Sequence, residues 1–156
     1  MRIALASDHA AIALKAELAL WLAETGHDVS DLGPDSATSV DYPDYGYLLA
    51  NHVAAGKAER GIALCGSGIG ISIAVNRHPA VRCALVSEPF SARLARGHND
   101  ANILALGARV IGSEMAKACV EAFLVTAFAG APASADNRHQ LRVDKLSHPA
   151  IDRETA

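Results

Sequence analysis

A cysteine stands directly before a glycine-rich turn, in the run Cys65-Gly66-Ser67-Gly68-Ile69-Gly70. Glycines at every second position let the backbone curl so that several N–H groups point at one spot. A helical pattern follows the turn, and the positive N-terminal end of that helix would face the same spot. Such a turn stabilises an anion, which can be a phosphate group of a ligand or an oxyanion that forms during a reaction.

The position of Cys65 favours the oxyanion. A thiol beside a helix N-terminus ionises more readily, and its thiolate can act as a base or a nucleophile. We therefore interpret the turn as the cradle of an enediolate that forms when Cys65 removes a proton. The alternative is a small buried residue at a strand end, as unpaired cysteines often are. A dinucleotide site is disfavoured because Ile71 replaces the third glycine of the G-x-G-x-x-G fingerprint and the turn has no phosphate-loop lysine.

Two other polar groups could take part in the same chemistry. The group Ser7-Asp8-His9 follows the first expected strand, and His98-Asn99-Asp100 follows an expected helix. Asp8 and His98 could share the proton transfers that open a sugar ring. A purely structural role for the histidine remains the alternative.

Arg138 and Arg142 stand four residues apart, so they project from one face of the last expected helix. Paired guanidinium groups have a shape suited to phosphate. A solvated surface pair is the alternative. The phosphate interpretation requires this helix to pack over the carboxyl edge of its own sheet or over that of a neighbouring subunit.

The hydrophobic periodicity predicts five strands that alternate with helices. The expected strands are residues 2–6, 27–32, 61–64, 82–86 and 102–105. The expected helices are residues 10–25, 45–56, 71–77, 89–96, 113–128 and 137–146, with Ser87 as the N-cap of the fourth. Loops are expected at 33–44 and 131–136, and a polar tail at 147–156.

Five strand–helix units in series predict an α/β fold of one domain over residues 1–156. We expect a three-layer, Rossmann-like, doubly wound sheet of five parallel strands with helices on both faces. Ligands bind at the carboxyl ends of the strands in such sheets. We therefore expect all the polar groups described above to lie along one edge.

Composition excludes several classes of protein. Hydrophobic residues make up 51% of the chain and the net charge is −3 without a basic block, so nucleic acid is not expected as a partner. Three cysteines without a C-x-x-C pair fit a reducing compartment, and no apolar run approaches the roughly 20 residues of a membrane span. We expect a soluble cytoplasmic protein. Seven histidines show no metal-binding spacing, so no metal and no cofactor are expected.

Taken together, the motifs resemble the ribose-5-phosphate isomerase B family, which also holds the galactose-6-phosphate isomerase subunits. The pieces occur in the family's order over nearly the whole chain. They are Ser7-Asp8-His9-Ala10, Asp41-Tyr42-Pro43-Asp44, Cys65 to Ser72, Ser87-Glu88-Pro89, His98-Asn99-Asp100 with Asn102, Gly107-Ala108-Arg109, and Arg138-His139-Gln140 with Arg142-Val143. One family branch uses a glutamate as the base, but Ile71 stands at that position here, so the chain is similar to the cysteine branch.

The resemblance implies a role for each candidate residue. The expected catalytic residues are Cys65 as the base, Ser67 as the carrier of a proton between O1 and O2, and Asp8 and His98 in ring opening. The expected substrate-binding residues are Gly66, Gly68, Gly70 and Asn99 on the enediolate, Tyr42 on the sugar, and His9, Arg109, Arg138 and Arg142 on the phosphate.

The resemblance also implies an activity and an assembly. The activity is the reversible isomerisation of D-ribose 5-phosphate and D-ribulose 5-phosphate through a cis-enediolate, without metal or nucleotide. Three alternatives stay open, namely a six-carbon substrate such as allose or galactose 6-phosphate, a non-catalytic module that binds nucleotides or phosphosugars, and a metal-dependent isomerase. Family members are dimers or tetramers with sites built across a subunit interface, where residues 137–156 are expected to lie.

Overall fold

A five-stranded parallel sheet forms the middle layer of the protein, which a computed structural model describes over residues 1–130 and 137–148. The strands are β1 (Arg2–Ser7), β2 (Asp28–Asp31), β3 (Arg60–Cys65), β4 (Cys83–Leu85) and β5 (Ile103–Gly107), in the order β2-β1-β3-β5-β4. All five predicted strands are present, so the α/β doubly wound class is confirmed. The loop predicted at 131–136 and most of the predicted tail lie outside the described residues.

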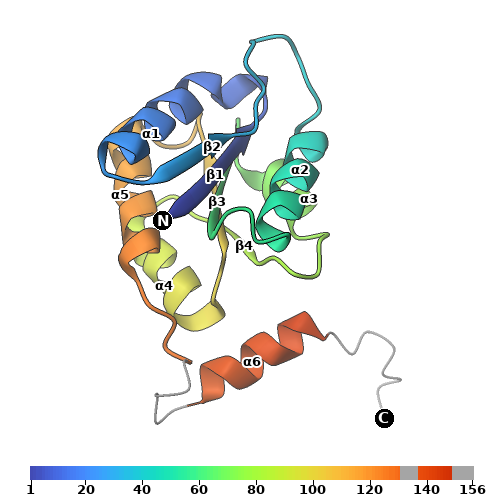
Figure 1. The fold of residues 1–156 in the computed structure, drawn as a ribbon, viewed down its shortest axis with the longest axis vertical. Helices are drawn as coiled ribbons and strands as arrows, with labels where there is room; N and C mark the ends of the chain where they lie inside the picture. Colours follow the sequence, from blue (N-terminus) through green and yellow to red (C-terminus); the bar gives the residue numbers. More distant parts are fainter. Residues whose placement is uncertain (131–136, 149–156) are drawn as a thin grey trace.

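Helices cover both faces of the sheet (Figure 1). One layer holds α1 (Ile12–Glu24), α4 (Pro89–Asn99) and α5 (Ser113–Val125), and the other holds α2 (Tyr42–Ala54) and α3 (Ile69–Val75). A short 3-10 turn, η1 (His9–Ala11), joins β1 to α1. The last helix, α6 (Arg138–Ser147), packs against α4.

Side-chain size differs between the two faces of the sheet. In β1, Ile3 and Leu5 face the layer of α1, α4 and α5, whereas Ala4 and Ala6 face α2 and α3. Successive residues of a strand point to opposite faces, so this alternation divides large and small side chains between the two cores. The small side chains let α2 and α3 come close to the sheet.

A buried lysine fixes the loop after β2. Lys15 of α1 is almost fully buried, and its ammonium group donates to the Asp31 carboxylate and to the carbonyl oxygen of Pro34. A buried charge requires such partners, because an unpaired one is strongly destabilising. The pairing anchors the start of the segment that leads into α2.

Several helix boundaries differ from those predicted. Helix α2 begins at Tyr42 rather than 45, because Pro43 fits the first turn and Asp41 precedes it in extended conformation. Helix α4 continues to Asn99 rather than 96. Its N-cap is Glu88 rather than Ser87, because the Glu88 carboxylate accepts hydrogen bonds from the backbone N–H groups of residues 90 and 91 at 2.6 and 2.7 Å.

The strand order creates a crevice between β1 and β3. The chain moves outward from β1 to β2, then crosses back to place β3 on the other side of β1. The connections that leave these two neighbouring strands therefore diverge, which opens a space at their carboxyl ends. Ser7 and Cys65 are the last residues of β1 and β3, so the residues that follow them border this space.

Candidate active site

The crevice at the carboxyl edge holds a cleft of about 440 Å³. It gathers side chains and backbone from the ends of β1, β3 and β5 and from the start of α2. The lining residues are Asp8, His9, Ala10, Tyr42, Cys65, Gly66, Ser67, Gly70, Arg109 and Val110. Most of the residues singled out in the sequence therefore meet in one place.

Cys65 lies at the floor of this cleft with an exposed fraction of only 4%. Its Sγ accepts a hydrogen bond from the backbone N–H of Gly68 at 3.0 Å. The sulfur is therefore tied to the glycine-rich turn at the floor of the cleft.

The other two cysteines contrast with Cys65. Burial raises the pKa of Cys83 to about 12. Burial, together with the charge of Glu88, raises the pKa of Cys119 to about 11. Neither residue lines the cleft. Both thiols therefore stay protonated at neutral pH.

The glycine-rich turn uses some of its N–H groups internally and leaves others free. Besides the bond from Gly68 to sulfur, the N–H of Ile69 donates to Ser67 Oγ at 3.2 Å. Within the described residues, the N–H groups of Gly66 and Ser67 donate to no protein group. The amides of Gly68 and Ile69 are therefore engaged within the turn itself. Two donors beside Cys65 remain available for an oxyanion.

Only glycine fits the centre of this turn. Gly68 has φ +78°, and a Cβ there would overlap Leu85 and lie 2.9 Å from the carbonyl carbon of Leu106. Gly107 matters for the same reason, since its Cβ would lie 2.6 Å from the Ser67 carbonyl oxygen. The turn is thus pressed against the end of β5, which fixes the donors relative to Cys65.

Asp8 and His9 form the opposite wall of the cleft. Asp8 is buried and caps η1, with Oδ1 accepting from the N–H of Ala10 at 2.9 Å. His9 Nδ1 accepts from the N–H of Val40 at 3.3 Å, which leaves the ring proton on Nε2 as a donor. The loop before α2 thereby orients the imidazole.

Tyr42 and Arg109 complete the wall. A Cβ on Gly70 would lie 2.7 Å from the Tyr42 ring, so the ring packs directly over the turn. The N–H of Arg109 donates to the carbonyl oxygen of Gly66 at 3.0 Å, and its side chain passes close to Gly66. Arg109 is exposed and supplies a positive charge to the cleft.

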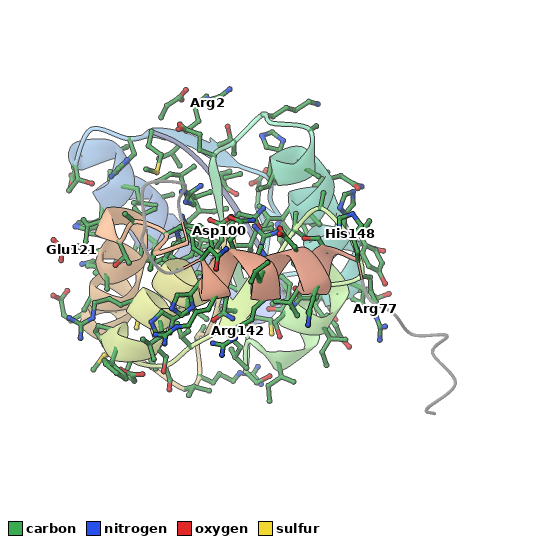
Figure 2. The ribbon with its side chains drawn as sticks, turned by 90° about the horizontal axis from the view of Figure 1, so that it is seen from below. Arg2, Arg77, Asp100, Glu121, Arg142 and His148 are labelled. Atoms are coloured by element: carbon green, nitrogen blue, oxygen red, sulfur yellow. The ribbon has the colours of Figure 1, made fainter. Side chains whose placement is uncertain are left out.

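Four candidate residues lie at the opposite edge of the sheet, where the strands begin. Helix α4 starts after the end of β4 and returns across the sheet, so His98 and Asn99 in its last turn reach the amino edge. Arg138 and Arg142 belong to α6, which packs on that end of α4 (Figure 1). Figure 2 views the molecule from this side and labels Arg142.

The expectation that all polar groups share one edge is therefore wrong within a single chain. His98-Asn99-Asp100 stands at the end of a helix, so the direction of that helix decides which edge of the sheet these residues reach. A helix that connects parallel strands runs antiparallel to them, so its end lies near the strand beginnings. The possibility that the last helix covers the carboxyl edge of its own sheet is excluded because α6 packs against the end of α4 at the amino edge.

Comparison with known proteins shows to which family the chain belongs. A model of the ribose/galactose isomerase family matches residues 3–146. The chain belongs to that family. It is 43% identical over 146 residues to ribose-5-phosphate isomerase B of Escherichia coli, covering 94% of both chains.

Two further members are informative. The ribose-5-phosphate isomerase B structure from Clostridium thermocellum superposes with a TM-score of 0.89 at 44% identity, over 94% of this chain and 95% of that one. A D-erythrulose-4-phosphate isomerase of Pectobacterium atrosepticum is 42% identical over 131 residues, which is 83% of this chain and 86% of the relative.

Within this isomerase, sequence reasoning missed the role of His139. Its ring is buried and stacks on that of His98, with centroids 4.3 Å apart and planes 14° from parallel. The stack ties α6 to the end of α4. Nothing in the spacing of His98 and His139 signals this contact, because the two residues lie on separate helices.

The described residues contain neither a cluster of metal-ligating side chains nor a membrane-spanning helix. In residues 1–130 and 137–148, no three side chains of the histidine, cysteine, aspartate or glutamate type converge as a metal site would require. No helix in the same ranges has the length and apolarity to cross a bilayer.

Proposed function

We propose that this isomerase interconverts D-ribose 5-phosphate and D-ribulose 5-phosphate through a cis-enediolate, with Cys65 as the base. The observation that carries the proposal is the buried Cys65 Sγ, held at 3.0 Å by the Gly68 N–H beside two unused amide donors. The substrate assignment is supported by the relative in Escherichia coli.

The proton transfer balances without a cofactor. The Cys65 thiolate removes the proton from C2 of the open-chain aldose, and the electron pair forms a C1–C2 double bond with negative charge on O1. The free N–H groups of Gly66 and Ser67 stabilise this charge. The Ser67 hydroxyl carries a proton from O2 to O1, and the thiol returns its proton to C1, which yields the ketose.

Ring opening and phosphate binding involve a second copy of the chain in this proposal. Asp8 and His9 lie in the cleft, whereas His98 and Asn99 lie at the opposite edge. In a two-fold dimer, the carboxyl edge of one protomer can face the amino edge of its partner. The second copy then supplies His98 for ring opening, Asn99 for the enediolate, and the arginines of α6 for the phosphate.

The same arrangement explains the arginine pair. Arg138 and Arg142 are exposed on α6, away from the cleft that holds Cys65. Together with His9 and Arg109 of the first copy, they bracket the phosphate from two sides. We propose a homodimer or homotetramer located in the cytoplasm, which acts on a small sugar phosphate without nucleic acid or membrane.

An isomerase assay with chelator present tests the proposal. The purified chain should convert ribose 5-phosphate, and Cys65→Ala should lower kcat by at least about a thousandfold because it removes the base. Cys83→Ala is the matched control, because it removes a protonated thiol outside the cleft and should keep nearly full activity. Near-normal turnover by Cys65→Ala would refute the mechanism.

Chain length of the sugar is a separate question, raised by the four-carbon relative from Pectobacterium. The values of kcat/KM for four-, five- and six-carbon aldose phosphates should be highest for ribose 5-phosphate. A higher value for a four- or six-carbon sugar would change the substrate but leave the role of Cys65 intact.

A further inference from the structure

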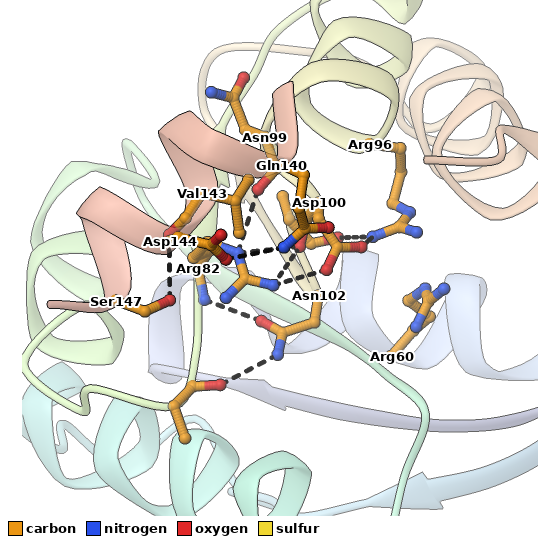
Figure 3. Close-up of polar contacts among 12 residues, drawn as sticks. Arg60, Arg82, Arg96, Asn99, Asp100, Asn102, Gln140, Val143, Asp144 and Ser147 are labelled. Carbon is orange, nitrogen blue, oxygen red and sulfur yellow. Dashed lines mark hydrogen bonds and ion pairs between the residues drawn. The ribbon is translucent and has the colours of Figure 1, made fainter. Parts of the chain in front are cut away.

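We propose that Asp100, held by Arg82 and Arg96, is a positioning residue that fixes His98 and Asn99 in the shape needed to enter the cleft of a second copy. Asp100, Arg82 and Arg96 lie around the last turn of α4 at the amino edge (Figure 3). This inference rests on the proposed two-copy site, and its test separates the two ideas.

The backbone of Asp100 carries strain. Its φ of +46° is the one positive value of a non-glycine residue in the described part of the chain. This left-handed conformation is unfavourable for residues other than glycine, although asparagine and aspartate tolerate it best. It ends α4 directly after His98 and Asn99 and redirects the chain toward β5.

Two arginines hold the Asp100 carboxylate. Arg82 Nη2 contacts Oδ2 at 2.7 Å, and Arg96 Nη1 contacts Oδ1 at 2.7 Å. The Arg96 side chain is only 5% exposed, and a buried positive charge is destabilising unless a partner such as the Asp100 carboxylate compensates it. Both pairs are charge-assisted hydrogen bonds and constrain the geometry more than neutral ones do.

The same arginines hold the backbone around Asp100. Arg82 Nε donates to the carbonyl oxygen of Asn99 at 3.0 Å and to that of Asp100 at 3.1 Å. Arg96 Nη1 donates to the carbonyl oxygen of Ala101 at 2.7 Å. Three consecutive carbonyl groups are thus fixed, while the side chains of His98 and Asn99 remain exposed.

A third arginine, Arg60, adds positive charge near the Asp100 carboxylate. Burial lowers the pKa of the Arg60 guanidinium, and the nearby charge of Arg96 lowers it further, whereas Asp100 acts in the opposite direction. Glycine or asparagine could adopt the same backbone, but neither would offset the positive charge of this cluster. A helix can end without such a cluster of charges. The cluster instead holds the backbone that carries the exposed side chains of His98 and Asn99.

The first test is the kinetics of Asp100→Asn, which keeps a side chain that tolerates the left-handed backbone. We expect kcat for ribose 5-phosphate to fall by about 10- to 100-fold, because a misplaced catalytic group has effects of that size. KM should change less than about threefold, since the phosphate-binding arginines are unaltered. If Asp100→Asn does not fold, Arg82→Gln removes the carbonyl bonds while leaving the buried Arg96 paired.

The matched control is Arg93→Gln, which removes an exposed arginine of the same helix that contacts Phe90 rather than Asp100. It should leave kcat and KM unchanged. Equal losses in Arg82→Gln and Arg93→Gln would overturn the proposal, because they would reflect the loss of charge on α4 and its surroundings rather than of the clamp.

A subunit-mixing experiment distinguishes positioning from general damage. In a hybrid of Asp100→Asn with Cys65→Ala chains, one cleft combines an intact Cys65 with an intact His98 platform from the other chain. Random pairing should restore about a quarter of wild-type activity. If Asp100→Asn merely damages its own chain, that cleft stays impaired and the mixture is no more active than its parents, which would refute positioning. A parallel mixture of His98→Ala with Cys65→Ala chains tests the two-copy site itself. Recovered activity in that mixture would show that one active site draws residues from two copies.

Discussion

Gly68→Ala should destabilise the isomerase through two separable effects. An alanine at φ +78° costs about 1–2 kcal/mol in left-handed strain. Its Cβ would also overlap Leu85 and lie 2.9 Å from the carbonyl carbon of Leu106, and overpacking of this kind costs about 1–3 kcal/mol. The free energy of unfolding should therefore fall by about 2–5 kcal/mol, which for a chain of this size lowers Tm by about 5–15 °C.

Two other glycines isolate the contributions. Gly56 has φ +70° but open space around it, so Gly56→Ala should lose only the strain term of about 1–2 kcal/mol. Gly66 lacks a positive φ, and a Cβ there would meet the Arg109 side chain at an ordinary 3.6 Å, so Gly66→Ala should be nearly neutral for stability. Urea denaturation gives all three values. If Gly68→Ala were no more destabilised than Gly56→Ala, the close packing of the turn against β5 would be wrong.

Two further outcomes follow from the site. Replacing either Arg138 or Arg142 singly with alanine should raise KM by about 10- to 100-fold with a smaller change in kcat, since one charge-assisted hydrogen bond contributes about 1.5–3 kcal/mol. An unchanged KM in steady-state kinetics would remove that residue from phosphate binding. Iodoacetamide at about pH 8 should label Cys65 first and abolish activity in step, because the pKa values of Cys83 and Cys119 are raised to about 12 and about 11. Mass spectrometry that finds another cysteine labelled first would contradict this.

Most strands and helices follow from the hydrophobic pattern, because four of the five strands are built around short apolar runs, whereas β2 (Asp28–Asp31) is largely polar. The convergence of Asp8, Cys65 and the glycine-rich turn was also predictable, since all three follow the ends of parallel strands. Arg109 joins them because it follows the end of β5. The position of a residue at the end of a strand can be predicted from the local sequence.

Other features depend on contacts between distant segments. The start of α2 could have been placed at Tyr42 from Asp41 and Pro43, which signal a first turn. The stacking of His98 on His139 could not have been predicted from the sequence, because it depends on where α6 packs. The position of His98 at the far edge follows from the return direction of α4, a topological rule that the polar pattern of its last turn does not reveal.

The most direct test of the account is to combine two inactive variants, Cys65→Ala and His98→Ala, by co-expression or by joint refolding. Each variant alone should have little activity. If one active site draws Cys65 from one chain and His98 from another, half of the randomly paired dimers carry one intact site, and the mixture should recover about a quarter of wild-type kcat per chain. Activity of the mixture that stays at the level of the separate variants would contradict a site shared between two copies.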